Sequence, residues 1–185
     1  MAHAGKIIEN PRTRQRLTFL RTAGESDGRT LEFEVATQGT GAELPPHVHP
    51  EQEERIAVLA GAVRLSVGGR STTLAAGEEA TVPRGTAHTW SCVGGGETET
   101  RVHVTLTPAC DAETFLETMY GLSRDGHTNP KGMPKPLQMA VLAHSHRDEM
   151  AFAGAPRILQ RAVLGVLAPI GRLAGYQPRY DRYST

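Results

Sequence analysis

Apolar and polar residues alternate in short segments up to residue 108, and glycine or proline interrupts each segment. The stretch 30–37, TLEFEVAT, places three apolar side chains on one face and two glutamates on the other, as in a half-buried strand. The stretch 62–74, AVRLSVGGRSTTL, repeats the pattern and turns at its two adjacent glycines. Further strands are expected within 79–93 and 99–108. Short strands at this spacing predict a mainly β fold, either a sandwich or a barrel.

The periodicity changes after residue 108. Residues 110–126 space their apolar side chains at helical intervals after a possible N-cap aspartate, and residues 137–152 also have a helical pattern. A last helix is expected over 156–176. The sequence therefore predicts a β domain at residues 1–108 and a helical C-terminal extension at 109–185.

The last predicted helix carries a wide apolar stripe, and Pro169 is expected to kink or split it. Arginines outnumber acidic residues in the last 30 positions, so a membrane-surface helix is one interpretation. Packing against the β domain or against a second copy of the chain is the interpretation we favour. The stripe consists of Ile158, Leu159, Ala162, Val163, Val166 and Leu167.

Charge and cysteine content narrow the functional classes. Twenty basic side chains balance twenty acidic ones, which gives no reason to expect a nucleic-acid partner. No apolar run approaches the roughly 18 residues typical of a membrane span, and no signal-peptide pattern occurs at the N-terminus. Cys92 and Cys110 are too few for a disulfide framework. These features predict a reduced, cytoplasmic protein.

The stretch 45–61, PPHVHPEQEERIAVLAG, concentrates histidines and acidic residues before an apolar run. His47 and His49 are two positions apart, so on a strand they project from one face. Glu54 shares the parity of the apolar positions that follow, whereas its neighbour Glu53 shares that of Arg55. Because an arginine should face water, we expect Glu54 to point inward. The other polar residues, Glu51, Gln52 and Glu53, are expected at the rim or in solvent.

An inward carboxylate beside two imidazoles needs a compensating charge, and a divalent metal would supply it. A fourth candidate ligand is His88, which follows the proline- and glycine-rich turn PRGTAH and shares a strand face with Trp90 and Cys92. The alternative is that all four side chains are surface polar residues at loop ends. The complete set of candidate metal ligands is His47, His49, Glu54 and His88.

These stretches resemble the two sequence motifs of the cupin superfamily. The first, G-x5-H-x-H-x4-E-x6-G, is matched by Gly41, His47, His49, Glu54 and Gly61. The second, G-x5-P-x-G-x2-H, is matched by Gly77, Pro83, Gly85 and His88. The resemblance covers about residues 28–108 and implies a small double-stranded antiparallel β-barrel of the jelly-roll type, with three histidines and one glutamate binding a metal in its mouth. Cys92 stands where the second motif usually has an asparagine, which is structural in the family.

The remaining cysteine and histidine side chains are interpreted without a chemical role. Cys92 is expected to be a small buried hydrophobic side chain. His103 alternates with two valines and is expected to face solvent. His144 and His146 point in different directions on a helix and are expected at the surface.

Three imidazoles and one carboxylate would leave open positions on a six-coordinate metal for O2, water or a bidentate substrate. The metal could be Fe, Mn, Ni or Zn. Apolar walls favour a hydrophobic or aromatic small molecule, and the expected wall residues are Phe33, Ile56, Val58 and Trp90. Three functions stay open: a dioxygenase-type oxidoreductase on an enol, phenolic or diketone-like substrate, a non-redox isomerase or cyclase, and a non-catalytic binding protein. The resemblance and the apolar stripe also suggest a homodimer.

Overall fold

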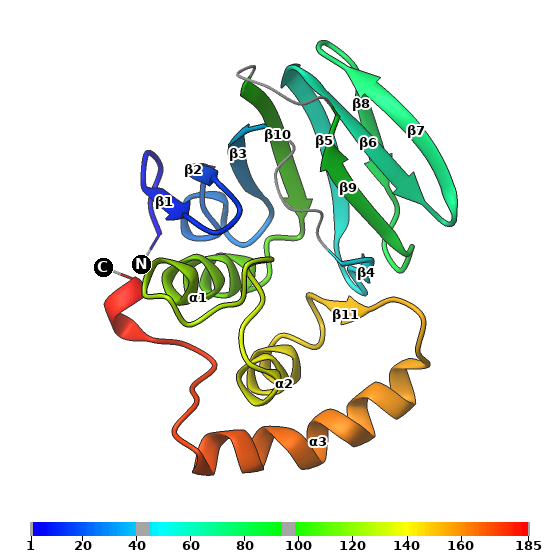
Figure 1. Cartoon of the computed structure of the whole chain (residues 1–185). Coiled ribbons are helices and arrows are strands. Elements are labelled where there is room, and N and C mark those ends of the chain that lie inside the picture. The colour runs from blue at the N-terminus through cyan, green and yellow to red at the C-terminus, as the bar shows by residue number, and fades with distance from the viewer. Residues whose placement is uncertain (1, 40–44, 94–98, 185) are drawn as a thin grey trace.

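The computed structural model describes residues 2–39, 45–93 and 99–184, so motif residue Gly41 lies outside the described residues. Two antiparallel sheets face each other in a jelly-roll arrangement (Figure 1). The larger sheet has the order β1 (Ile7–Asn10), β2 (Gln15–Arg21), β3 (Leu31–Gln38), β10 (Glu99–Thr107), β5 (Glu53–Ala60) and β8 (Glu79–Val82). The smaller has the order β11 (Ala151–Phe152), β4 (His47–Val48), β9 (His88–Cys92), β6 (Ala62–Val67) and β7 (Arg70–Ala75). The predicted mainly β jelly-roll class is confirmed, but the two sheets form an open sandwich rather than a closed barrel.

The alternating segments form strands because one face of each can be buried between the sheets. In β3, Leu31, Phe33 and Val35 are buried, and the glutamates between them are partly exposed. Motif residue Gly61, between β5 and β6, has φ +73°, and a Cβ there would lie 2.5 Å from the Thr100 hydroxyl. Glycine is therefore required at this turn by both backbone conformation and space.

Two short 3₁₀ turns (Gly24–Ser26 and Asp181–Tyr183) and three α-helices complete the fold. Helix α1 (Ala112–Arg124) packs along β1. Helix α2 (Pro136–Ser145) packs against α3 (Arg157–Leu173), which lies on its outer side (Figure 1). The helical part also returns to the sandwich through β11, which pairs with β4. A domain boundary at residues 108/109 stays a prediction.

The helix expected over 137–152 is wrong in its second half. Helix α2 ends at Ser145, and the carbonyl of His146 accepts hydrogen bonds from the amides of Glu149 and Met150. This turn reverses the chain, so that Ala151–Phe152 adds to β4 as a strand. Tertiary pairing outweighs the local helical pattern here.

Helix α3 continues through Pro169 as one element, so the proline does not split it. Its small residues Ala168 and Gly171 are buried, whereas most of the predicted apolar stripe faces solvent. Within the described chain, no helix has both the length and the apolar character needed to cross a membrane. The large side chains exposed on α3 are Ile158, Leu159, Val163, Val166, Ile170 and Leu173.

Candidate metal centre

Three histidines and one glutamate meet at the end of the sandwich where β4 and β9 pair. His47 in β4 is directly opposite His88 in β9, and His49 follows β4 immediately. Glu54 projects inward from β5 and is buried, as its parity predicts. One potential ligand atom from each of the four residues lies within 4.8 Å of the others. The structure thus brings together all four side chains predicted as ligands.

Backbone carbonyl groups orient all three imidazoles. The Nδ1 atoms of His47, His49 and His88 lie 3.0, 2.6 and 3.0 Å from the carbonyl oxygens of Pro45, Glu149 and Thr86, respectively. Because a carbonyl oxygen can only accept, each Nδ1 must carry the hydrogen and donate it. In the neutral ring, each Nε2 then offers its lone pair, which is the arrangement a metal-binding histidine requires.

The turn of the second motif also fixes the first. Gly85 has φ +74°, and its amide donates a hydrogen bond of 2.8 Å to the carbonyl of His49. Glu54 and His88 are 34 positions apart in the sequence. A backbone hydrogen bond therefore connects the two motifs in addition to the contacts between their side chains.

The buried polar atoms at the centre fit a cation. Glu54 Oε2 and His88 Nε2 lie 2.6 Å apart, yet neither has a hydrogen bond of acceptable geometry within the described residues. Leaving such atoms unpaired in the interior is costly. A metal ion between the carboxylate and the imidazoles would satisfy both atoms at once.

The protonation of the cluster also suits a cation. Burial, followed by the charges of His49 and His88, lowers the pKa of His47 to about 4, so this ring is neutral near pH 7. Burial alone would raise the pKa of Glu54, but the short contact with His88 and the nearby imidazoles outweigh it and lower that pKa. Burial alone would lower the pKa of His88, but the adjacent Glu54 carboxylate outweighs it and raises that pKa. His88 must therefore lose any proton from Nε2 before that atom can bind a metal.

The prediction that Gln52 lies at the rim is wrong. Its side chain is fully buried, and its amide donates hydrogen bonds of 2.9 and 3.0 Å to the carbonyl oxygens of Pro108 and Ala109. Gln52 is two positions before Glu54, so the alternation of strand faces that predicted an inward Glu54 also predicts an inward Gln52. Glu51 and Glu53 are exposed, as predicted.

The prediction that His146 lies at the surface is also wrong. It is 3% exposed, packs edge-on against Phe115 and has its Nδ1 atom 3.6 Å from Glu149 Oε2. The reversal after α2 buries it, and the backbone of Glu149 in this turn orients His49. No motif signals Glu149, because it lies 100 residues from its partner. His144 is partly exposed.

Neither Cys92 nor His103 joins the cluster. Cys92 is a free, buried thiol whose pKa is raised by burial despite the nearby hydroxyls of Thr37 and Thr100, in keeping with a packing role. His103 projects away from the cavity, is partly exposed and lies 3.4 Å from a carboxylate oxygen of Glu32.

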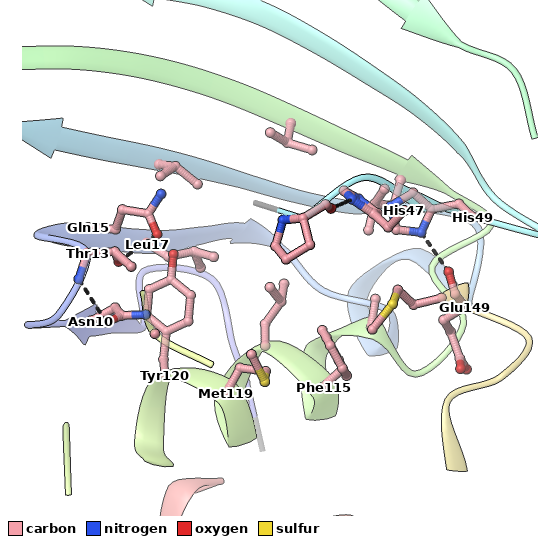
Figure 2. Close-up of a pocket in the computed structure, with 18 of the residues that line it drawn as sticks. Asn10, Thr13, Gln15, Leu17, His47, His49, Phe115, Met119, Tyr120 and Glu149 are labelled. Atoms are coloured by element: carbon pink, nitrogen blue, oxygen red, sulfur yellow. Dashed lines mark hydrogen bonds between the residues drawn. The ribbon is translucent and has the colours of Figure 1, made fainter. Parts of the chain in front are cut away.

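A cavity of about 170 Å³ lies between the larger sheet and α1, and His47, His49 and Glu54 open into it (Figure 2). Phe33 and Trp90 line it, as expected for substrate contacts. Ile56 and Val58 point inward as predicted but are fully buried in the core, away from the described cavity wall. Substrate binding by any of the four stays a prediction. Much of the remaining wall is apolar and includes Leu116, Met119, Met133, Met139 and Phe152.

Part of the β sandwich is similar to known proteins. Residues 34–105 match the family described as "Cupin domain". Quercetin 2,3-dioxygenase from Bacillus subtilis (strain 168) is 36% identical over 67 residues, which are 36% of this chain and 20% of that protein. The chain thus matches about a fifth of the length of this curated relative.

Two solved structures support the fold alone. An RmlC-like cupin from Shewanella frigidimarina has 19% identity and a TM-score of 0.50, over 61% of this chain and 96% of that one. KdgF from Halomonas sp. has 15% identity and a TM-score of 0.51, over 61% and 99% of the two chains. Residues 34–105 thus match a cupin domain, and the two sheets have the fold of cupin structures.

Proposed function

We propose that this protein is a metal-dependent oxidoreductase of the dioxygenase type, acting on a small enol, phenolic or diketone-like molecule. The observation that carries the proposal is the convergence of three Nε2 lone pairs and one carboxylate on the wall of a largely apolar cavity. The matched stretch of a quercetin dioxygenase supports the choice of reaction, because quercetin is a phenolic compound.

Each residue has a defined part in this proposal. His47, His49, His88 and Glu54 would hold one divalent transition metal, Fe, Mn, Ni or Zn. That ion would supply Lewis acidity and, if redox-active, a path for electrons between an enolate and O2. The backbone carbonyls at Pro45, Thr86 and Glu149 keep the rings aligned. The apolar wall, including Phe33 and Trp90, excludes water and accepts the ligand body.

Oxygen consumption tests the proposal. Protein loaded separately with each of the four metals is mixed with a flavonol, a catechol and a β-diketone, and O2 uptake is recorded. We expect uptake with at least one redox metal and one substrate, and its loss in Glu54→Gln. Isomerisation or cyclisation without O2 uptake would instead establish a non-redox enzyme. Retention of an unchanged ligand would establish a binding protein, and either result would contradict the dioxygenase assignment.

We further propose that the chain forms a homodimer in the cytoplasm through the exposed face of α3. Leu159, Val163, Val166, Ile170 and Leu173 recur at alternating intervals of four and three residues, the spacing of a two-helix seam. Their side chains are 46–91% exposed, so a partner helix would remove much apolar surface from water.

Sedimentation equilibrium measures this association. We expect the wild-type chain to sediment as a dimer and Val166→Asp to sediment as a monomer, because the carboxylate would be buried in the seam. Thr72→Asp, at an exposed position of β7, is the matched control and should remain dimeric. A wild-type monomer at high protein concentration would contradict the proposed dimer.

A further inference from the structure

The cavity has a second polar end, away from the histidines. Asn10, Thr13 and Gln15 from β1, β2 and their connection meet Tyr120 from α1 there, and all four line the cavity. Figure 2 shows this group at one end, His47 and His49 at the other, and Met119 and Phe115 between them. The cavity thus joins two polar ends through an apolar middle.

Most polar atoms at this second end already have partners. The side-chain oxygen of Asn10 accepts hydrogen bonds from the Thr13 amide at 3.2 Å and the Ser123 hydroxyl at 2.5 Å. The Thr13 hydroxyl donates to the side-chain oxygen of Gln15 at 2.9 Å. These bonds hold the strand connection against α1 and use the side-chain oxygen of Gln15, whose amide nitrogen makes no such bond.

Three donor groups at this end make no hydrogen bond within residues 2–39, 45–93 and 99–184. They are the Tyr120 hydroxyl, Gln15 Nε2 and Asn10 Nδ2. Tyr120 and Gln15 are each 8% exposed, and Figure 2 shows the Tyr120 hydroxyl directed toward Gln15. Burial raises the pKa of Tyr120 well above its usual range, so its hydroxyl stays neutral and able to donate. Leaving a buried hydroxyl without a partner is costly, and an acceptor atom of a ligand would remove that cost.

We propose that Tyr120 and Gln15 form a distal subsite that binds an oxygen of the substrate at the opposite end from the histidines. The ligand class is an elongated, largely apolar molecule with oxygen groups at both ends. This inference rests on the proposed function, because the near end of the ligand is assigned to the metal. Both subsite residues lie outside the matched residues 34–105, Gln15 on β2 and Tyr120 on α1.

A matched pair of flavonols tests the subsite. One probe is 3-hydroxyflavone, which offers a hydroxy-ketone only at one end, and the other is 3,4′-dihydroxyflavone, which adds a phenol at the far end. Dissociation constants are measured by fluorescence titration of metal-loaded protein under anaerobic conditions, so that no turnover contributes. We expect the second probe to bind about tenfold more tightly, the effect of one well-made hydrogen bond of about 1.4 kcal/mol.

Tyr120→Phe removes only the hydroxyl, and we expect it to reduce this preference to about one- to twofold. Tyr176→Phe, a tyrosine outside the cavity lining, is the matched control and should retain the tenfold preference of the wild type. Thermal unfolding of both variants checks that the fold persists. An undiminished preference in Tyr120→Phe, or failure of the wild type to bind either probe, would overturn the subsite.

The same titration without metal separates this inference from the proposed function. If both hold, removal of the metal weakens both probes and leaves their ratio unchanged. If only the metal assignment fails, each probe binds as tightly without metal as with it, and the wild type keeps its tenfold preference, which Tyr120→Phe removes. If only the subsite fails, binding depends on metal but the two probes bind alike.

Discussion

His88→Ala will weaken divalent-metal binding by at least about 100-fold, more than the 10- to 100-fold typical of losing a residue that merely orients a ligand. His88 lies 2.6 Å from Glu54 and is 2% exposed, so no other side chain of the described residues is placed to replace its Nε2. Competition with a chromogenic chelator at constant pH measures the dissociation constant, and circular dichroism checks that the variant is folded.

His103→Ala is the matched control for this variant. It also removes an imidazole from a central strand of the sandwich, but from the side away from the cavity. We expect its metal affinity to equal that of the wild type within about twofold. If both variants kept full affinity, the ion would be bound somewhere other than this cluster.

Lys6→Met will reduce the free energy of unfolding by about 3–5 kcal/mol, the cost of leaving a buried charge without its partner. The Lys6 ammonium group lies 2.7 Å from Glu117 on α1 and also donates to the carbonyl of Tyr183 at 3.2 Å. The side chains of Lys6 and Glu117 are only 10% and 3% exposed. This ion pair therefore attaches both the N-terminal segment and the C-terminal turn to α1. Urea denaturation measures the change.

Two comparisons separate lost charge pairing from general damage. The double variant Lys6→Met, Glu117→Leu should recover most of the lost stability, because it leaves no unpaired buried charge. Arg55→Met breaks the exposed ion pair of Arg55 with Glu79 and should cost less than about 1 kcal/mol. Equal losses of unfolding free energy in Lys6→Met and Arg55→Met would show that the buried ion pair stabilises the fold no more than the exposed one.

Local rules predicted the metal cluster because its ligands lie within short motifs of fixed spacing. Alternation placed Glu54 inside, and the two turns placed His47 and His88 on paired strands. The same rule, applied fully, would have placed Gln52 inside. The error came from treating a polar side chain as a rim residue, although its amide nitrogen can donate to the backbone carbonyls of Pro108 and Ala109.

Contacts between distant segments could not be predicted in this way. The carbonyl of Glu149 reaches His49 only because the chain reverses after α2 and adds β11 to the sheet, whereas the local pattern indicated helix. The distal end of the cavity likewise combines Gln15 with Tyr120, which no short-range pattern relates. The cavity is therefore a product of tertiary packing, and the metal cluster is largely a product of local spacing.

The metal content of the reconstituted wild-type protein tests the central claim most directly. Purified protein is stripped with a chelator, dialysed against each of iron(II), manganese, nickel and zinc, and analysed by elemental mass spectrometry together with His88→Ala. We predict about one ion per chain for at least one metal in the wild type, as four converging ligands require, and a loss of that ion in the variant. A wild-type protein that retains none of the four metals would contradict a metal centre at His47, His49, Glu54 and His88.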